Sequence, residues 1–167
     1  MLRLFDRFRK RPQQDAWSAS AYLCDGMLIV HANNRTYNNI GWNSEPISTI
    51  AYASDNALIG QLIRSTVLAS RWDAEHADSL GSDNPVLQAA GVKSWTTMER
   101  KALLIHMGLR EGTFTVIPYR ATLRGEGRGW SGLEEHITLP EDCTDEELGD
   151  AAVQAFEICV PWKPKQY

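Results

Sequence analysis

The chain has 167 residues, of which 43% are hydrophobic and 23% charged, and its formal net charge is −4. This length and composition suit one soluble globular domain over residues 1–167, and the acidic balance argues against a dedicated nucleic-acid binder, which carries a basic excess. No stretch has the ~18 consecutive apolar residues of a membrane span, so we expect none.

The N-terminal segment, residues 1–14, begins with MLRLFDRFRKRP, which is basic but lacks the apolar run of a signal peptide. Leu2, Phe5 and Phe8 recur every three residues among arginines, a pattern compatible with a short amphipathic helix on a membrane surface. Helices this short are marginal in water, so the simpler interpretation is a flexible, solvated end.

The first predicted elements are two strands joined by a tight turn. Tyr22–Cys24 and Met27–Ala32 flank Asp25-Gly26, a dipeptide typical of two-residue hairpins. Asn33–Asn43 is rich in asparagine and contains a glycine, so we predict a loop there.

Three helices are predicted in the middle of the chain. Apolar residues at helical spacing predict the first from Ser54 to Ser70, with Ser54 or Asp55 as its N-cap. Asn84-Pro85 has the order of an N-cap and a first helical position, which predicts a short helix over Pro85–Ala90 ended by Gly91. A further short helix begins at Ser94 and runs to about Arg100.

The C-terminal half begins with a predicted hairpin. Ala102–Leu109 and Thr113–Arg120 are strand-like, and a three-residue loop, Arg110–Gly112, separates them. Pro118 cannot donate to a sheet ladder, so it predicts an edge strand or a bulge. The alternation returns over Glu134–Leu139, which predicts another strand.

A closing helix is predicted after that strand. Thr144 and Glu147 fit a capping box, with further acids in the first turn. The expected core face of this helix consists of Leu148, Ala151, Ala152, Ala155, Phe156 and Cys159. The order helix, strand, strand, strand, helix predicts an α+β fold, a single domain with a largely antiparallel sheet and packing helices.

Residues 123–132, LRGEGRGWSG, resemble phosphate-binding loops in their glycine content. Such a loop must run from a strand into a helix, where free amides meet the phosphates. Here the predicted elements on both sides are strands, and no Lys-Ser/Thr pair follows. We therefore interpret the glycines as turn residues, expect no nucleotide, and expect Trp130 to fold back onto the sheet.

No catalytic or metal site emerges from the cysteines and histidines. Cys24, Cys143 and Cys159 are an odd set without paired spacing, which indicates reduced thiols. His31, His106 and His136 lie in strand-like segments without metal-ligand spacing, so we expect packed or surface side chains.

The densest polar cluster is WDAEHAD, residues 72–78. His76 and its acidic neighbours have the chemistry of a metal or acid–base site, whereas a solvated acidic loop explains them more simply. We therefore expect no enzyme activity and no cofactor.

Residues 91–159 resemble a known family. The stretches GVKSWTTMERKALLIHMGLREGTFTVIPYRA, GRGWSGLEEHITLP and DCTDEELGDAAVQAFEIC look like immunity proteins of bacterial contact-dependent growth inhibition (CDI) systems. The helix start Asp145–Gly149, after a strand that ends in Leu-Pro, is the most specific part. The resemblance implies a cytoplasmic protein that binds the C-terminal toxin domain of a large effector, often a nuclease, and blocks it by stoichiometric binding.

Acidic residues without a structural role agree with this implication. Nuclease domains need basic surfaces, so acids on an inhibitor steer its encounter with the toxin. Residues 41–90 hold six acids against two arginines, and Trp72 is an aromatic of the type enriched at binding hot spots. The first predicted toxin-binding set, the Trp72 group, is Trp72, Asp73, Glu75, Asp78 and Asp83; a second, the Trp130 group, is Glu126, Trp130 and Glu134.

Two other classes stay open from the residues alone. One is a small metal-dependent hydrolase built around His76. Near-stoichiometric metal binding that is lost in His76→Ala would favour this alternative. The other is an α+β interaction module with an unrelated partner.

Overall fold

The computed structural model describes residues 14–35, 41–72, 84–122 and 129–163, and these form seven strands and four helices. The strands are β1 (Ala16–Cys24), β2 (Met27–Arg35), β3 (Gly41–Ala51), β4 (Leu103–Arg110), β5 (Thr113–Ala121), β6 (Trp130–Gly132) and β7 (Ile137–Pro140). The helices are α1 (Asn56–Leu68), α2 (Pro85–Ala89), α3 (Trp95–Lys101) and α4 (Asp145–Ile158). No helix of the described part is long and apolar enough to cross a membrane.

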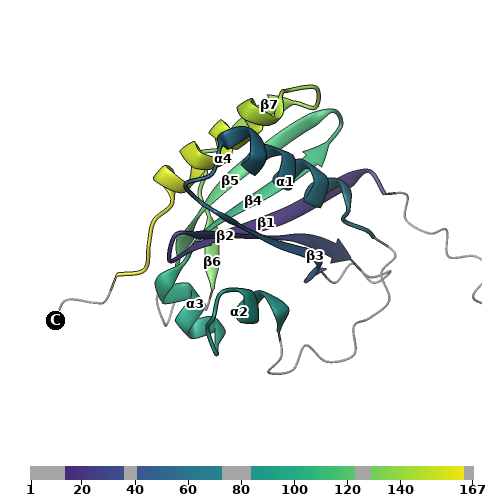
Figure 1. The fold of residues 1–167 in the computed structure, drawn as a ribbon. Helices are drawn as coiled ribbons and strands as arrows, with labels where there is room; N and C mark the ends of the chain where they lie inside the picture. The colour runs from purple at the N-terminus through teal and green to yellow at the C-terminus, as the bar shows by residue number, and fades with distance from the viewer. Residues whose placement is uncertain (1–13, 36–40, 73–83, 123–128, 164–167) are drawn as a thin grey trace, which may run out of the picture.

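The strands form one sheet in the order β3-β2-β1-β4-β5-β6, and β7 also pairs with β5. All pairs of named strands are antiparallel. Helices α1 and α4 cover one face of the sheet, while α2 and α3 lie against the other (Figure 1). This arrangement confirms the predicted α+β class with an antiparallel sheet.

The first hairpin is confirmed, but the loop predicted after it is wrong. Asp25 and Gly26 have φ of 49° and 78°, and Cys24 pairs with Met27 across this two-residue turn. Strand β2 continues through Asn33–Arg35, and β3 begins at Gly41, although Asn33–Asn43 was expected to be a loop. The pairing of β3 with β2, interrupted by one register shift between His31 and Ala32, supplies the hydrogen bonds that override the weak strand propensity of these residues.

The β4–β5 hairpin differs from its prediction in its turn. Arg110 pairs directly with Thr113, so the loop has two residues, Glu111 and Gly112, rather than three. Both residues have positive φ, 50° and 73°, as this tight turn requires.

Pro118 marks neither an edge nor a bulge. The β4–β5 register reaches Pro118 without a shift, and the outer side of β5 pairs with β7 up to Val116 and with β6 from Tyr119. Pro118 lies between these two stretches, where its carbonyl oxygen accepts a hydrogen bond from the Leu133 amide at 2.9 Å. Its missing N–H therefore falls in a gap of the ladder and costs no strand hydrogen bond.

The glycine-rich stretch joins β5 to β6, which confirms a strand-to-strand connection; residues 123–128 lie outside the described residues. Gly129 has φ of 121°, a conformation that side chains other than glycine rarely adopt. The strand expected over Glu134–Leu139 is shorter, since only Ile137–Pro140 pairs with β5.

The predicted helix starts are confirmed by their caps. Asp55, rather than Ser54, accepts a hydrogen bond from the Ala57 amide, and Asn84 accepts one from the Val86 amide. Thr144 and Glu147 form the expected capping box of α4.

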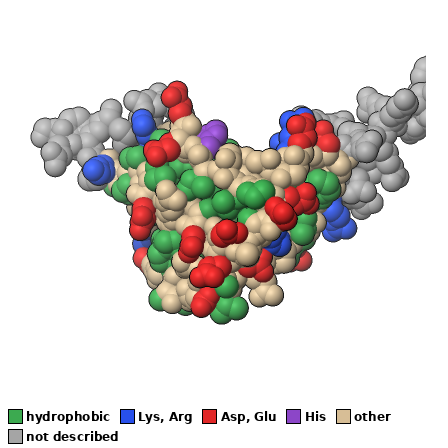
Figure 2. All heavy atoms as spheres, turned by 90° about the horizontal axis from the view of Figure 1, so that it is seen from above, with side chains coloured by type: hydrophobic (Ala, Val, Ile, Leu, Met, Phe, Trp, Pro, Cys, Tyr) green, Lys and Arg blue, Asp and Glu red, His purple; other side chains and the backbone are tan. Residues whose placement is uncertain are grey.

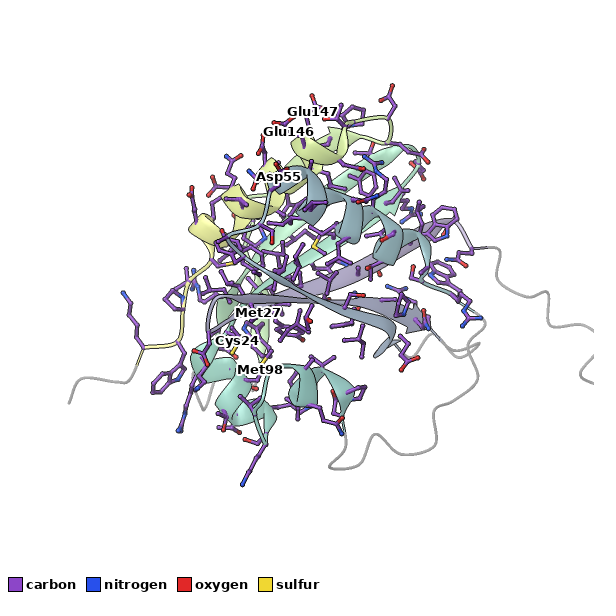
Figure 3. All side chains as sticks on the ribbon, in the orientation of Figure 1. Cys24, Met27, Asp55, Met98, Glu146 and Glu147 are labelled. Atoms are coloured by element: carbon purple, nitrogen blue, oxygen red, sulfur yellow. The ribbon has the colours of Figure 1, made fainter. Side chains whose placement is uncertain are left out.

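Two hydrophobic clusters lie on opposite faces of the sheet. The larger one, under α1 and α4, contains the whole predicted face of α4, including Leu148, Phe156 and Cys159. The smaller cluster joins Tyr22 and Ile29 of the sheet to Met98 of α3. Figure 3 shows Cys24 and Met98 on this second side, with Glu146 and Glu147 on the outside of the helical layer opposite.

Candidate functional site

Trp72 is the only member of the Trp72 group that lies within the described residues; Asp73, Glu75, Asp78 and Asp83 fall in residues 73–83, outside them. Its half-buried ring lies under the guanidinium of Arg35, whose Cζ is 5.3 Å from the ring centroid. Both side chains line a cleft of about 180 Å³, the Trp72 cleft, together with the ends of β1 and β4.

Backbone hydrogen bonds place Trp72 beside Arg35. The Arg35 amide donates to the Arg71 carbonyl at 2.8 Å, and the Arg71 amide donates to the Asn34 side-chain oxygen at 2.7 Å. The segment that leaves α1 is thereby tied to the end of β2. The cation over Trp72 is therefore fixed by the meeting of two elements far apart in the sequence.

A polar cluster forms one wall of the cleft. His106 of β4 lines the cleft. The Nδ1 atom of His106 lies 3.5 Å from Ser20 Oγ and 3.2 Å from Asn33 Nδ2. With the Asn33 amide assigned as donor to Nδ1, the ring proton is on Nε2. Burial, assisted by the charge of Arg35, lowers the pKa of His106 to about 4, so the ring is neutral near pH 7.

Ser20 and His106 are the two residue types of a nucleophile and its general base, but their arrangement does not favour catalysis. A general base works best with a pKa near the operating pH, whereas the pKa of His106 is about 4. Its Nδ1 also accepts from Asn33, so it is already engaged. The cluster is suited to offering hydrogen bonds rather than to removing protons.

The Trp130 group lies at the other end of the sheet. The Trp130 ring packs 5.4 Å from that of Tyr22 and 6.5 Å from that of Trp95, which confirms that it folds back onto the sheet. Its Nε1 is buried and has no hydrogen-bond partner among the described residues. Glu134 is exposed and lines an open cleft of about 570 Å³ with Arg120, and Glu126 lies outside the described residues.

The two groups are not brought together. The Trp72 cleft lies near Arg110, which pairs with Thr113 at the start of β5, whereas Arg120 is at the end of β5. Seven residue steps along a strand separate these positions by roughly 24 Å. Whether either group binds a partner stays a prediction.

The outer surface of the α1–α4 layer is acidic. Figure 2 looks onto this layer and shows carboxylates spread across it, with apolar side chains between them. The exposed acids of this region are Asp55, Glu141, Asp142, Glu146, Glu147, Asp150 and Glu157. Three of them have structural roles, since Asp55 caps α1, Glu147 completes the capping box of α4, and Asp150 accepts a hydrogen bond from the Asn56 side chain of α1.

Comparison with known proteins identifies the family. The sequence model of the CdiI family, described as CDI immunity protein, matches residues 18–159, which is most of the chain. The chain belongs to the CDI immunity protein family. No curated protein matches it.

Two solved structures share the fold of this CDI immunity protein at low sequence identity. A protein of unknown function, NMB0488 from Neisseria meningitidis, is 14% identical with a TM-score of 0.69, and the alignment covers 88% of this chain and 97% of that one. A chain of the CdiA-CT/CdiI toxin and immunity complex from Yersinia pseudotuberculosis is 13% identical with a TM-score of 0.64, covering 86% and 97%.

The described residues of the immunity protein hold no group of three or more histidine, cysteine or acidic side chains that could bind a metal. His76, around which a hydrolase was considered, lies outside them. The three cysteines are free, in agreement with the interpretation as reduced thiols, and all three are buried.

Sequence reasoning missed three residues of the Trp72 cleft. Arg35 fell in a predicted loop, His106 was interpreted as a packed or surface residue, and Arg110 was assigned to a turn. These residues come from β2 and β4; strand register brings them together, and the hydrogen bonds between Arg71 and the end of β2 bring Trp72 beside them. No local sequence signal marks them as neighbours.

Proposed function

We propose that this chain binds the C-terminal toxin domain of a CDI effector and neutralises it by stoichiometric binding in the cytoplasm, without catalysis. The observation that carries the proposal is the CdiI family match over residues 18–159. The similarity of its fold to a chain of a toxin and immunity complex supports the same conclusion. The Ser20–His106 geometry, which does not favour a general base, agrees with an inhibitor that acts by binding.

The toxin is proposed to have a basic surface and to be a nuclease. The net charge of −4 and the carboxylates over α1 and α4 make the inhibitor complementary to a protein that holds phosphates (Figure 2). Acids of this kind act mainly on the association rate, because long-range attraction steers the encounter. The acids of the Trp72 group are proposed to add to this field.

Growth protection tests the function. Cells that produce the toxin domain encoded beside this chain should grow when they also produce the chain, and should stop growing when they carry an empty vector. The two proteins should also co-purify at equal molar amounts. Toxin that arrests growth equally in both cultures would refute the proposal.

Charge reversal tests where steering arises. Asp73, Glu75 and Asp78 changed together to Lys should slow association on the order of tenfold at low salt, and less at high salt. Asp142, Glu146 and Glu157 are the matched set on the helical layer, all exposed. An unchanged rate in both triple variants would show that steering by these acids is wrong. Unfolding measured in parallel should change little, because exposed charges contribute little to stability.

A further inference from the structure

The α1–α4 layer carries an excess of negative charge that its own residues do not neutralise. Residues 52–68 and 141–158 hold eight acidic residues and one basic residue, Arg64. Arg64 is engaged within the layer, since its Nε donates to Asp145 at 2.6 Å and its Nη1 donates to the Glu141 carbonyl at 2.9 Å. Among the described residues, no lysine or arginine forms an ion pair with the other seven carboxylates.

Helix α1 adds an uncharged ridge to this surface, the α1 ridge, which consists of Leu58, Gln61, Ser65 and Leu68. All four side chains are exposed, and the two leucines are 52% and 51% exposed. Steps of three and four residues place the four side chains on one side of the helix. Figure 2 shows apolar side chains and carboxylates next to one another on this surface. A partner with both apolar and basic side chains would complement it.

The N-terminal segment joins the described part of the chain at one end of this ridge. Gln14 Nε2 donates at 2.8 Å to the carbonyl oxygen of Ser70, which lies two residues beyond the end of α1. The Ser18 amide donates to the Ser70 hydroxyl at 2.9 Å, so the start of β1 is fixed beside the C-terminal end of α1. Residues 1–13, which lie outside the described residues, are therefore tethered at that end of the α1 ridge.

The basic part of this segment is tethered beside the most acidic part of the layer. Residues 7–11 hold three arginines and one lysine, and residues 1–13 contain a single acid. The C-terminal end of α1 is the negative end of its helix dipole, and its last turn contains no basic residue. Five of the eight acids of the layer lie in residues 141–147, and Arg64, in the second half of α1, binds this stretch.

The length and the apolar residues of the segment match the α1 ridge. The ridge is roughly 15 Å long, and residues 2–11 would span about the same length as a helix and roughly 33 Å when extended. Leu2, Phe5 and Phe8 recur every three residues, so a helix would bring them to one side, and Pro12 would end it. A helix this short is marginal in water, and packing on the ridge would supply the contacts that it lacks.

We propose that residues 2–11 dock on the α1–α4 layer of their own chain, with the apolar side chains on the α1 ridge and the basic ones against residues 141–147. The docked segment shields an acidic surface that would otherwise attract any basic protein. The toxin binds by displacing it, a step that rests on the proposed function. Because the tether makes the contact intramolecular, weak interactions suffice to hold it. Such a shield excludes weak basic partners more than a tight one, which favours specificity.

Amide NMR signals of the full chain without toxin test the docking. The N-terminal triple variant is Arg7→Gln, Arg9→Gln and Lys10→Gln. The control triple variant removes three exposed basic residues outside the layer: Lys93→Gln, Arg100→Gln and Lys163→Gln. The N-terminal triple variant should shift the signals of the α1 ridge, and the control should leave them in place. Salt at about 0.5 M should move the wild-type signals to the positions of the N-terminal variant, because salt screens exposed charges.

The rate of association with the toxin domain tests the shielding. Both triple variants make the net charge more negative by the same amount, so the difference between their rates isolates the effect of the shield. A surface that is covered about two thirds of the time is free about one third of the time. The N-terminal triple variant should therefore associate roughly threefold faster than the control at low salt, and at the same rate at about 0.5 M salt.

Four outcomes decide the inference. Identical signals of the α1 ridge in the wild type and the N-terminal triple variant would overturn the docking. Equal association rates of the two triple variants at low salt would overturn the shielding. Binding to phosphatidylglycerol vesicles that is lost in the N-terminal variant, with no shift of the ridge signals, would assign the segment to a membrane surface instead. Absence of toxin binding by every chain would overturn the proposed function, while the NMR signals would still decide the docking.

Discussion

Replacing Gly149 with alanine should destabilise the protein, although alanine is the better helix former. A Cβ at this position of α4 would lie 1.9 Å from the Asn56 carbonyl oxygen and 2.6 Å from its carbon. Ordinary contacts begin at 3.4 Å, so α1 and α4 would have to separate by about 1.5 Å. Gly60 on α1 is the reciprocal case, since its Cβ would lie 1.7 Å from the Asp145 carbonyl oxygen.

The size of this effect follows from two opposing terms. In an exposed helix, Gly→Ala gains about 1 kcal/mol. Overpacking that forces the backbone to shift costs typically 1–3 kcal/mol, and here both obstacles are backbone atoms. Because backbone atoms block the Cβ, we take the upper end of this cost, about 3 kcal/mol, which leaves an expected net loss of about 2 kcal/mol, or a drop in Tm of about 4–8 °C for a chain of this size.

Urea and thermal unfolding of Gly149→Ala, followed by circular dichroism, measure this loss. Gln154→Ala on the exposed face of the same helix is the control and should change stability by less than about 0.5 kcal/mol. A Gly149→Ala variant that is more stable than the wild type would refute the close approach of the two helices.

Three further predictions concern the core and its titratable groups. The Phe156 side chain is 3% exposed, and its ring meets the Tyr52 ring edge-on with the centroids 5.8 Å apart. Phe156→Ala should therefore lower the free energy of unfolding by about 3–5 kcal/mol, and a loss below about 1 kcal/mol would show that this face of α4 is not packed. Burial lowers the pKa of His31 and of His106 from 6.5 to about 4, so between pH 4 and pH 6.5 the unfolded chain binds more protons than the folded one. The free energy of unfolding should therefore fall as the pH drops from 6.5 to 4, and equal urea midpoints at pH 7 and pH 5 would contradict this. Burial raises the pKa of the Cys24 and Cys159 thiols, and Cys143 is buried too, so a thiol reagent should label the native chain slowly and should label all three thiols after unfolding. Rapid labelling of the native chain would show that a thiol lies at the surface.

Features that depend on a few neighbouring residues could be predicted from the sequence. The caps of all four helices, the Asp25-Gly26 turn and the buried face of α4 follow from side chains that act within one or two turns of the chain. Features that depend on distant pairing could not. Strand β3 has little strand propensity of its own and exists through its pairing with β2, and Pro118 is accommodated because two separate strands meet on the far side of β5.

The candidate site also has one residue that the sequence could predict and several that it could not. Trp72 stood out in the sequence because an aromatic residue lies beside acids, and it lines the cleft. Its basic neighbours did not stand out, because Arg35, His106 and Arg110 are remote in sequence from Trp72. The β2–β1–β4 register and the hydrogen bonds between Arg71 and β2 make them neighbours. The prediction of an acidic environment for Trp72 rested on adjacent residues alone, whereas the described surroundings of its ring are cationic.

Titration of the toxin's activity with this chain tests the central claim most directly. A stoichiometric inhibitor removes activity in direct proportion to the amount added, so the activity of the toxin domain should fall linearly and reach zero at one equivalent, with no change on longer incubation. Undiminished activity at a large excess of the chain would contradict the account. Loss of activity at far less than one equivalent, growing with time, would contradict it as well, because it would show that the chain acts as an enzyme on the toxin.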